Sequence, residues 1–238
     1  MANLLFVLSS DIYVRNYLRS GVVTALQREH SVKIIADSRL ALLDEVEREP
    51  GYLGSFTLDE KIERRRELLF AVSMWRFRKR SATFFYRWLR MANWGAVRTN
   101  SGPLILVTTF IRWVGSLLVS PRPLVTALLG TPGIFSAAVR ALSRPNKVSE
   151  TITNLIGSHD FDAIVFPSAA FEPVIPDLIQ YGRTRGIQTL TLIDNWDNLT
   201  SKTVYLDKPD HIAVWGEQAK NQASAIHNFQ ENQIHLIG

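Results

Sequence analysis

The first 36 residues follow the pattern strand, helix, strand, and this unit restricts the fold more than any other feature of the chain. Residues 4–8 form an apolar run, residues 9–11 are of helix-capping types, and apolar residues then recur at helical spacing up to residue 26. A second run typical of a strand covers residues 32–36. Two strands joined by one helix need a crossover connection, which makes them parallel. We therefore expect an α/β protein built on a parallel sheet.

The last third of the chain repeats this alternation. Helical patterns at residues 173–185 and 216–229 separate short runs that are typical of strands. These runs cover residues 163–166, 189–193, 212–215 and 234–237. Alternation at both ends predicts a single doubly wound, Rossmann-like domain over residues 1–238, with three α/β/α layers and a mostly parallel sheet.

A long insertion interrupts the predicted sheet at about residues 59–150. It has no clear strand pattern: its first part is rich in arginine and aromatic residues, and its second part is apolar. The uncharged apolar stretches are short or broken by proline and glycine, whereas a membrane-spanning helix needs about 20 continuous apolar residues. We expect buried or interfacial helices in this insertion.

Positive charge is concentrated in the insertion. The whole chain has a formal net charge of +5, yet residues 61–99 hold 11 Lys or Arg against two Glu, which is a local charge of +9. A segment this basic predicts an anionic partner. Three interpretations stay open: a packed helix with a solvated basic face, an acidic membrane surface, or stacked single-stranded nucleic acid, which is the least favoured. The residues assigned to membrane contact are Arg76, Arg78, Lys79, Arg80 and Trp88.

Several classes of site are excluded by composition and motif. The chain contains no cysteine, which excludes disulfides, thiolate catalysis and sulfur-ligated metals. The five histidines are scattered, and neither a G-x-S-x-G elbow nor a Walker A loop occurs. The first residues also lack the basic region of a secretory signal. We expect a cytoplasmic protein, peripheral on the cytoplasmic face of the membrane where its basic segment meets lipid.

The turn after the first strand lacks the glycines that bring a backbone close to a pyrophosphate, so no dinucleotide cofactor is expected. It carries Ser9, Ser10, Arg15 and Asn16 where a helix N-terminus faces the carboxyl end of the strand. This position suits an anionic or hydroxyl-rich ligand. A capped helix with a solvated arginine explains the same residues.

Polar residues also follow the strand predicted at residues 189–193. These residue types suit a carbohydrate, because an aromatic ring can stack on the apolar side of a sugar while carboxylates and amides bind its hydroxyls. The alternative is a turn that is rich in side-chain caps. Asp194 and Asp197 are candidates for a general base. Two carboxylates indicate a metal only weakly, and none is expected. The residues assigned to substrate binding in this segment are Asn195, Trp196, Asn198, Thr200, Ser201 and Lys202.

A third candidate pair follows the strand predicted at residues 163–166. Ser168 and Glu172 belong to the same edge of the sheet as the two segments above, which makes them candidate substrate-binding residues. Glu172 precedes Pro173, so a helix start is the alternative explanation.

Two regions resemble a known class of enzymes. The opening, MANLLFVLSSDIYVRNYLRSGVVTALQREHSVKII, is similar to the start of the N-terminal, acceptor-binding lobe of GT-B glycosyltransferases. The segments DNWDNLTSK, KPDHIAVWGEQAKNQA and IHLIG resemble the corresponding region of bacterial surface-polysaccharide transferases related to the CDP-glycerol glycerophosphotransferases. The resemblance covers about residues 1–40 and 160–238 and leaves the insertion out.

This resemblance implies the acceptor-binding half of a glycosyl- or glycerophosphotransferase, acting on a sugar or lipid-linked glycan in surface-polysaccharide synthesis. It places Trp215 and Glu217 at the start of the next helix, with Glu217 as a further substrate-binding candidate. The residues that it places in the cleft between two lobes are Trp196, Asp197, Asn198, Thr200, Ser201 and Lys202. The nucleotide-sugar is expected to bind a C-terminal lobe that this sequence lacks, so a second lobe or subunit would supply it, and no cofactor is implied. The alternatives are the matching half of a nucleotide-sugar 2-epimerase and a non-catalytic membrane- or carbohydrate-binding adaptor.

Overall fold

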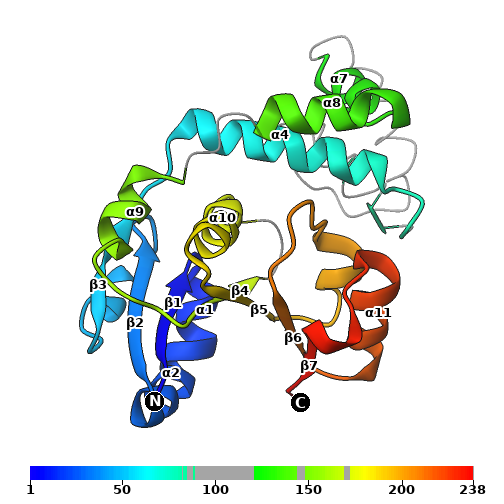
Figure 1. Cartoon of the computed structure of the whole chain (residues 1–238). Helices are drawn as coiled ribbons and strands as arrows, with labels where there is room; N and C mark the ends of the chain where they lie inside the picture. Colours follow the sequence, from blue (N-terminus) through cyan, green and yellow to red (C-terminus); the bar gives the residue numbers. More distant parts are fainter. Residues whose placement is uncertain (82, 85–87, 89–120, 144–147, 169–171, 238) are drawn as a thin grey trace, which may run out of the picture.

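The central feature of the protein is a parallel β-sheet (Figure 1). The computed structural model describes residues 1–81, 83–84, 88, 121–143, 148–168 and 172–237. Within these residues seven strands, all parallel, lie in the order β3-β2-β1-β4-β5-β6-β7. The strands are β1 (Asn3–Leu8), β2 (Ser31–Asp37), β3 (Tyr52–Phe56), β4 (Ala163–Ser168), β5 (Gln188–Ile193), β6 (His211–Val214) and β7 (Ile234–Leu236). The predicted parallel α/β fold is confirmed.

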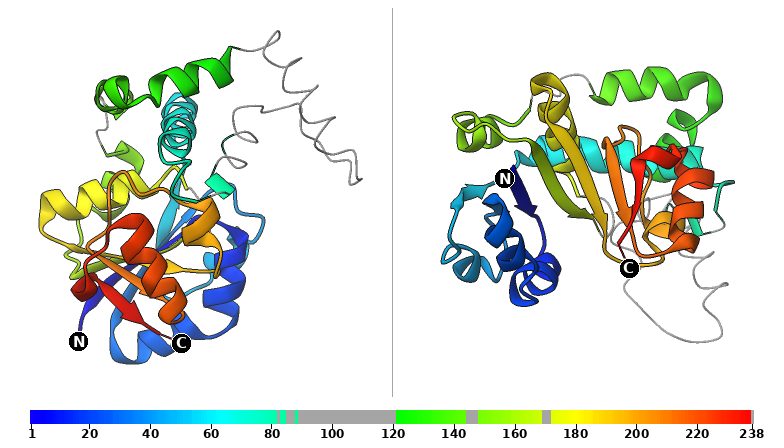
Figure 2. Two further views of the ribbon diagram at one scale, coloured as in Figure 1. Left: turned by 90° about the vertical axis from the view of Figure 1, so that its right-hand side faces the viewer. Right: turned by 60° about the horizontal axis from the view of Figure 1, so that its bottom comes forward.

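Helices cover both faces of this sheet, as the views in Figure 2 show. They connect the carboxyl end of one strand to the amino end of the next, as parallel strands require. The connecting elements are α1 (Asp11–Tyr13), the π-helical turn η1 (Val14–Arg19), α2 (Val22–Glu29), α3 (Leu43–Val46), α9 (Glu150–Ile156), α10 (Ile175–Arg185), the π-helical turn η2 (Asn198–Lys202), α11 (Glu217–His227) and the 3-10 turn η3 (Glu231–Gln233).

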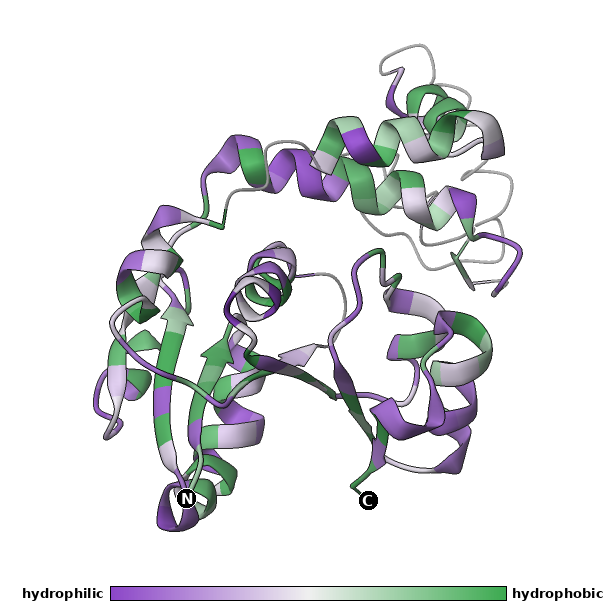
Figure 3. Cartoon of the chain, in the orientation of Figure 1, coloured by the Kyte–Doolittle hydropathy of each residue, from purple (hydrophilic) through white to green (hydrophobic). Residues whose placement is uncertain are grey.

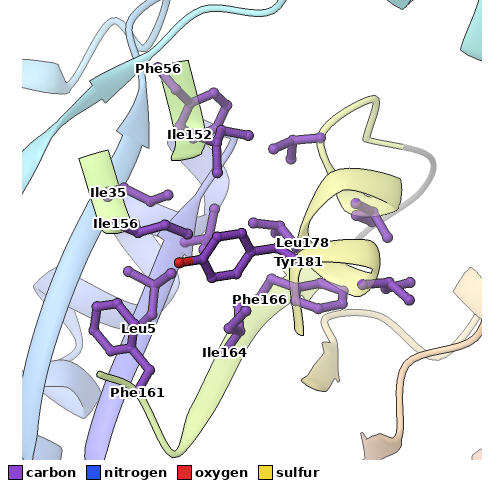
Figure 4. Packing of buried hydrophobic residues seen from close by; sticks show 14 of the residues in the cluster. Leu5, Ile35, Phe56, Ile152, Ile156, Phe161, Ile164, Phe166, Leu178 and Tyr181 are labelled. Carbon is purple, nitrogen blue, oxygen red and sulfur yellow. The ribbon is translucent and has the colours of Figure 1, made fainter. Parts of the chain in front are cut away.

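The core forms because side chains of a strand point alternately to its two faces. Leu5 of β1 lies on one face and packs in the cluster that includes Ile152 of α9 and Leu178 of α10 (Figure 4). Phe6 of β1 lies on the other face and packs with Tyr13 and the helices that follow β1. Both faces of β1 are therefore buried, as its nearly continuous apolar sequence requires.

Two predictions at this level need correction. The helix expected after the first strand is divided, because Gly21 adopts φ 82° between the π-helical turn η1 and α2. Strand β3 was not predicted, since its sequence YLGSF is short and interrupted by Gly54. Gly54 has φ 146°, and a Cβ there would lie 2.6 Å from the Leu155 side chain of α9. That position accepts only glycine without rearrangement.

The insertion forms a helical lobe beyond the carboxyl ends of the strands (Figure 1). It contains α4 (Glu60–Arg76), α7 (Arg122–Leu129) and α8 (Pro132–Ser143), which pack on one another. Asp59 caps α4 by accepting bonds from the backbone N–H groups of Lys61 and Ile62. No single helix in the described part of the chain is long and apolar enough to cross a membrane, and α7 with α8 passes such a test only as a pair bent by 106°.

One buried ion pair ties this lobe to the sheet domain. Arg66 of α4 contacts Asp177 of α10 with both terminal nitrogens, at 2.5 and 3.1 Å, and also donates to the carbonyl of Pro173. Both side chains are at most 3% exposed. The lobe is thereby fixed next to the segment that leaves β4.

Candidate ligand site at the carboxyl edge of the sheet

The strand order creates a crevice at the carboxyl end of β1. From β1 the chain moves first to β2 and β3 on one side, and later to β4 and β5 on the other. The chain segments that follow β1 and β4 therefore run in opposite directions along the sheet. Open α/β sheets bind their ligands where the direction of the connections changes in this way. Ser9 and Ser10 follow β1 here, and Ser10 also caps α1.

A cavity of about 260 Å³ opens at this position. Its wall is formed by residues of the turn after β1, the end of β2, the segment after β3 and the segment between β4 and α10. It combines hydroxyl groups, carboxylates and one guanidinium group with a small apolar wall. The lining residues are Ser9, Ser10, Asp37, Arg39, Leu58, Glu172, Pro173 and Val174.

Two hydroxyl groups hold the carboxylate of Glu172 at this cavity. The phenol of Tyr13 donates to its Oε1, and the hydroxyl of Ser168 donates to its Oε2 at 2.9 Å. Tyr13 and Ser168 are both fully buried, so two hydroxyl donors below the surface orient a partly exposed carboxylate above them. The structure thus brings the predicted residues Ser168 and Glu172 together with Ser9 and Ser10.

Arg39 supplies the positive charge of the cavity. Its Nη2 lies 2.7 Å from Asp37 and 2.7 Å from Glu63. Hydrogen bonds to these two carboxylates raise the pKa of Arg39, so it stays protonated. The sequence interpretation missed Asp37 and Arg39, although Asp37 ends β2 and the rule that ligands meet strand ends could have identified it.

Asp194 forms a second polar cluster at the end of β5. Its Oδ1 accepts a bond of 2.8 Å from Asn16 of η1, and its Oδ2 accepts one of 3.3 Å from Asn195. Asp194 is buried, and burial together with this carboxylate raises the pKa of Tyr17. The contact joins the first helical turn to β5, so the two segments singled out in the sequence do meet.

The rest of the loop after β5 is folded on itself. Lys202 pairs with Asp197 at 2.9 Å, and the hydroxyls of Thr200 and Ser201 donate to the Asp197 carbonyl. Asn198 is fully buried and donates to the carbonyl of Ser168 at 2.9 Å, which anchors η2 to β4. In this arrangement Asn198 supports the site from below and does not face a ligand.

Of the residues predicted for substrate binding or catalysis, Ser9, Ser10 and Glu172 line the cavity and the others do not. Arg15 and Glu217 are exposed and are not among the residues that line it. Trp196 is 73% exposed, so its ring is accessible but not part of a pocket wall.

The membrane assignment of Trp88 is contradicted by the structure. Trp88 is 2% exposed, its ring lies 4.4 Å from that of Trp75 between centroids, and its indole donates to Thr126 of α7 at 2.9 Å. It is a core residue of the helical lobe. Arg76 and Arg78 are partly exposed, and Lys79 and Arg80 are exposed.

Among the described residues no group of three or more His, Asp or Glu side chains is placed to hold a metal ion. A scan against protein-family models finds no match. Searches of curated proteins and of solved structures likewise find no match.

Proposed function

We propose that the cavity at the carboxyl end of β1 binds a hydroxyl-rich acceptor, and that the protein serves as the acceptor-binding half of a glycosyl- or glycerophosphotransferase. The observation that carries this proposal is Glu172, a carboxylate fixed by Tyr13 and Ser168 and directed to a cavity lined by Ser9 and Ser10. A fixed carboxylate accepts hydrogen bonds from sugar hydroxyls, and serine hydroxyls both donate and accept them.

Charge favours a neutral, hydroxylated ligand over a phosphate at this cavity. Asp37 and Glu172 both line it, while its one cation, Arg39, is engaged by Asp37 and Glu63. An anion would meet two carboxylates with no uncommitted cation among the lining residues. The turn after β1 also lacks glycine, so backbone N–H groups are not free to approach a pyrophosphate. This supports an acceptor site, with the nucleotide-sugar bound by a second lobe or subunit.

Within this proposal Glu172 is the carboxylate that contacts the ligand, and Asp194 and Asp197, which the sequence made candidates for a general base, have a structural role. Asp194 is 5% exposed and does not line the cavity, and its carboxylate bonds to Asn16 and Asn195. Asp197 is paired with Lys202. Both carboxylates hold the loop after β5 in place.

Saturation-transfer NMR with a panel of mono- and disaccharides tests the acceptor site. We expect Glu172→Gln to weaken binding of the best sugar by about 10- to 100-fold, because a hydrogen bond to a charged group contributes about 1.5–3 kcal/mol. Glu231→Gln is the matched control, since Glu231 is an exposed glutamate paired with Lys220 far from the cavity. Equal binding by both variants, or no saturation transfer from any sugar, would refute the acceptor site.

A further inference from the structure

The elbow formed by α7 and α8 exposes large apolar side chains. Leu124 and Leu128 are each 59% exposed, and Val125 and Ile134 are each 39% exposed. Leu124 and Leu128 are four residues apart and share one face of α7, opposite the face that buries Pro123 and Thr126. Four of the twelve large exposed apolar residues in the described part of the chain thus fall between residues 124 and 134.

Positive charge surrounds this elbow. The segments 68–81 and 121–143 contain no Asp or Glu. Pro132, at the bend between α7 and α8, lines the same depression of about 280 Å³ as the basic end of α4. In Figure 3 the ribbons of α7 and α8 carry mostly the colours of hydrophobic residues and lie beside α4. The cations of these segments are Arg76, Arg78, Lys79, Arg80, Arg122 and Arg140.

The arginines at the end of α4 are held by aromatic rings. Arg78 lies 4.1 Å from the centroid of Trp75, and Arg80 lies 4.3 Å from that of Phe77. Each also donates to a backbone carbonyl, Arg78 to that of Trp75 and Arg80 to that of Ile226 in α11. Stacking and hydrogen bonds together hold these guanidinium groups in place.

We propose that this elbow docks on an anionic lipid bilayer, with Leu124, Leu128 and Ile134 inserted below the headgroups. Arg76, Lys79 and Arg140, which are exposed or partly exposed, then bind lipid phosphates. Exposed leucines beside basic side chains match the two layers of a membrane interface, one apolar and one anionic. The inference goes beyond the acceptor site and does not depend on which ligand that site binds.

Two other occupants fit the observations less well. Single-stranded nucleic acid stacks on exposed aromatic faces, but Trp88 is buried and Arg78 covers Trp75. Nucleic acid also gains nothing from exposed leucines. A second copy of the chain would bury the leucines, but a two-fold contact would set this basic surface against itself.

Flotation with vesicles of phosphatidylcholine and phosphatidylglycerol (3:1), and of phosphatidylcholine alone, tests the docking. We expect the full chain to float with the anionic vesicles at low salt and to be released by high salt. Leu124→Ser/Leu128→Ser should lower the partition coefficient at least tenfold, and so should Arg76→Gln/Lys79→Gln. Leu236→Ser/Ile237→Ser is the matched control, because these exposed residues at β7 are distant from the lobe.

The measurements separate the possible outcomes. Absence of flotation, or flotation unchanged by the leucine pair, overturns the proposal. Binding to poly(U) that depends on the arginines but not on the leucines identifies a nucleic-acid surface instead and overturns it, as does a dimer in sedimentation that the leucine pair dissociates. Circular dichroism confirms that each variant is folded, and Glu172→Gln should float like the unaltered chain, which keeps this test independent of the acceptor site.

Discussion

Replacing Asp177 with alanine is expected to lower the free energy of unfolding by about 3–5 kcal/mol, because it leaves the guanidinium of Arg66 buried without its counter-ion. Arg66 is 4% exposed and Asp177 is fully buried. Both terminal nitrogens of Arg66 contact this one carboxylate. Urea denaturation followed by tryptophan fluorescence measures the loss.

Two controls separate a lost charge partner from a general loss of packing. Arg66→Met/Asp177→Leu removes both charges and keeps the volume filled, so it should lose far less stability than the single replacement. Asp207→Ala breaks the pair with Arg183, whose side chains are 61% and 49% exposed, and should cost less than about 1 kcal/mol. If Asp177→Ala were no more damaging than Asp207→Ala, the buried pair would not be what fixes α4 to α10.

Acidification is expected to destabilise the protein by about 3 kcal/mol through His227 alone. The pKa of His227 is lowered to about 4, chiefly by burial and also by the charges of Arg80 and Lys208, while the bond from its Nε2 to the carbonyl of Leu199 acts in the opposite direction. The ordinary value is 6.5. Between these two values the unfolded chain binds a proton that the folded chain does not. Stability is therefore lost as the pH falls below about 6.5, and this loss is complete near pH 4.

Comparison with His227→Gln isolates this contribution, because glutamine retains a donor for the Leu199 carbonyl and does not titrate. Urea midpoints at pH 7, 6, 5 and 4.5 should decline less steeply in the variant than in the unaltered chain. Carboxylates that titrate near pH 4 affect both proteins alike. Parallel declines in the two proteins would show that His227 is not buried as a neutral group.

Much of the fold could be predicted because strand and helix periods are local properties of the sequence. The strands at residues 163–166 and 189–193 and the helix α11 followed from apolar spacing alone. Strand β3 could not be predicted in the same way. It lies at the edge of the sheet, and its Gly54 is explained only by the side chain of Leu155, about 100 residues later in the chain.

Of the candidate site, the sequence could predict only the residues that directly follow a strand. Ser168, Glu172 and Asp194 were identified because each follows a predicted strand. Tyr13 was missed because its partner, Glu172, is 159 residues away, and no local pattern encodes that bond. The assignment of Trp88 to the surface failed for a related reason, since its neighbours Trp75 and Thr126 come from two separate helices.

The strand order also sets the order in which folding can proceed. Leu4 lies opposite Val32 on one side of β1 and opposite Ala163 on the other. Closing the longer of these loops, roughly 160 residues against roughly 30, costs about 1.5 kcal/mol more in chain entropy. We expect β1–β3 and β4–β7 to assemble as two local halves before they join at the centre of the sheet. Because this cost rises only with the logarithm of length, doubling the segment between β3 and β4 would add only about 0.6 kcal/mol, so the lobe is the part of the chain whose size can change most freely.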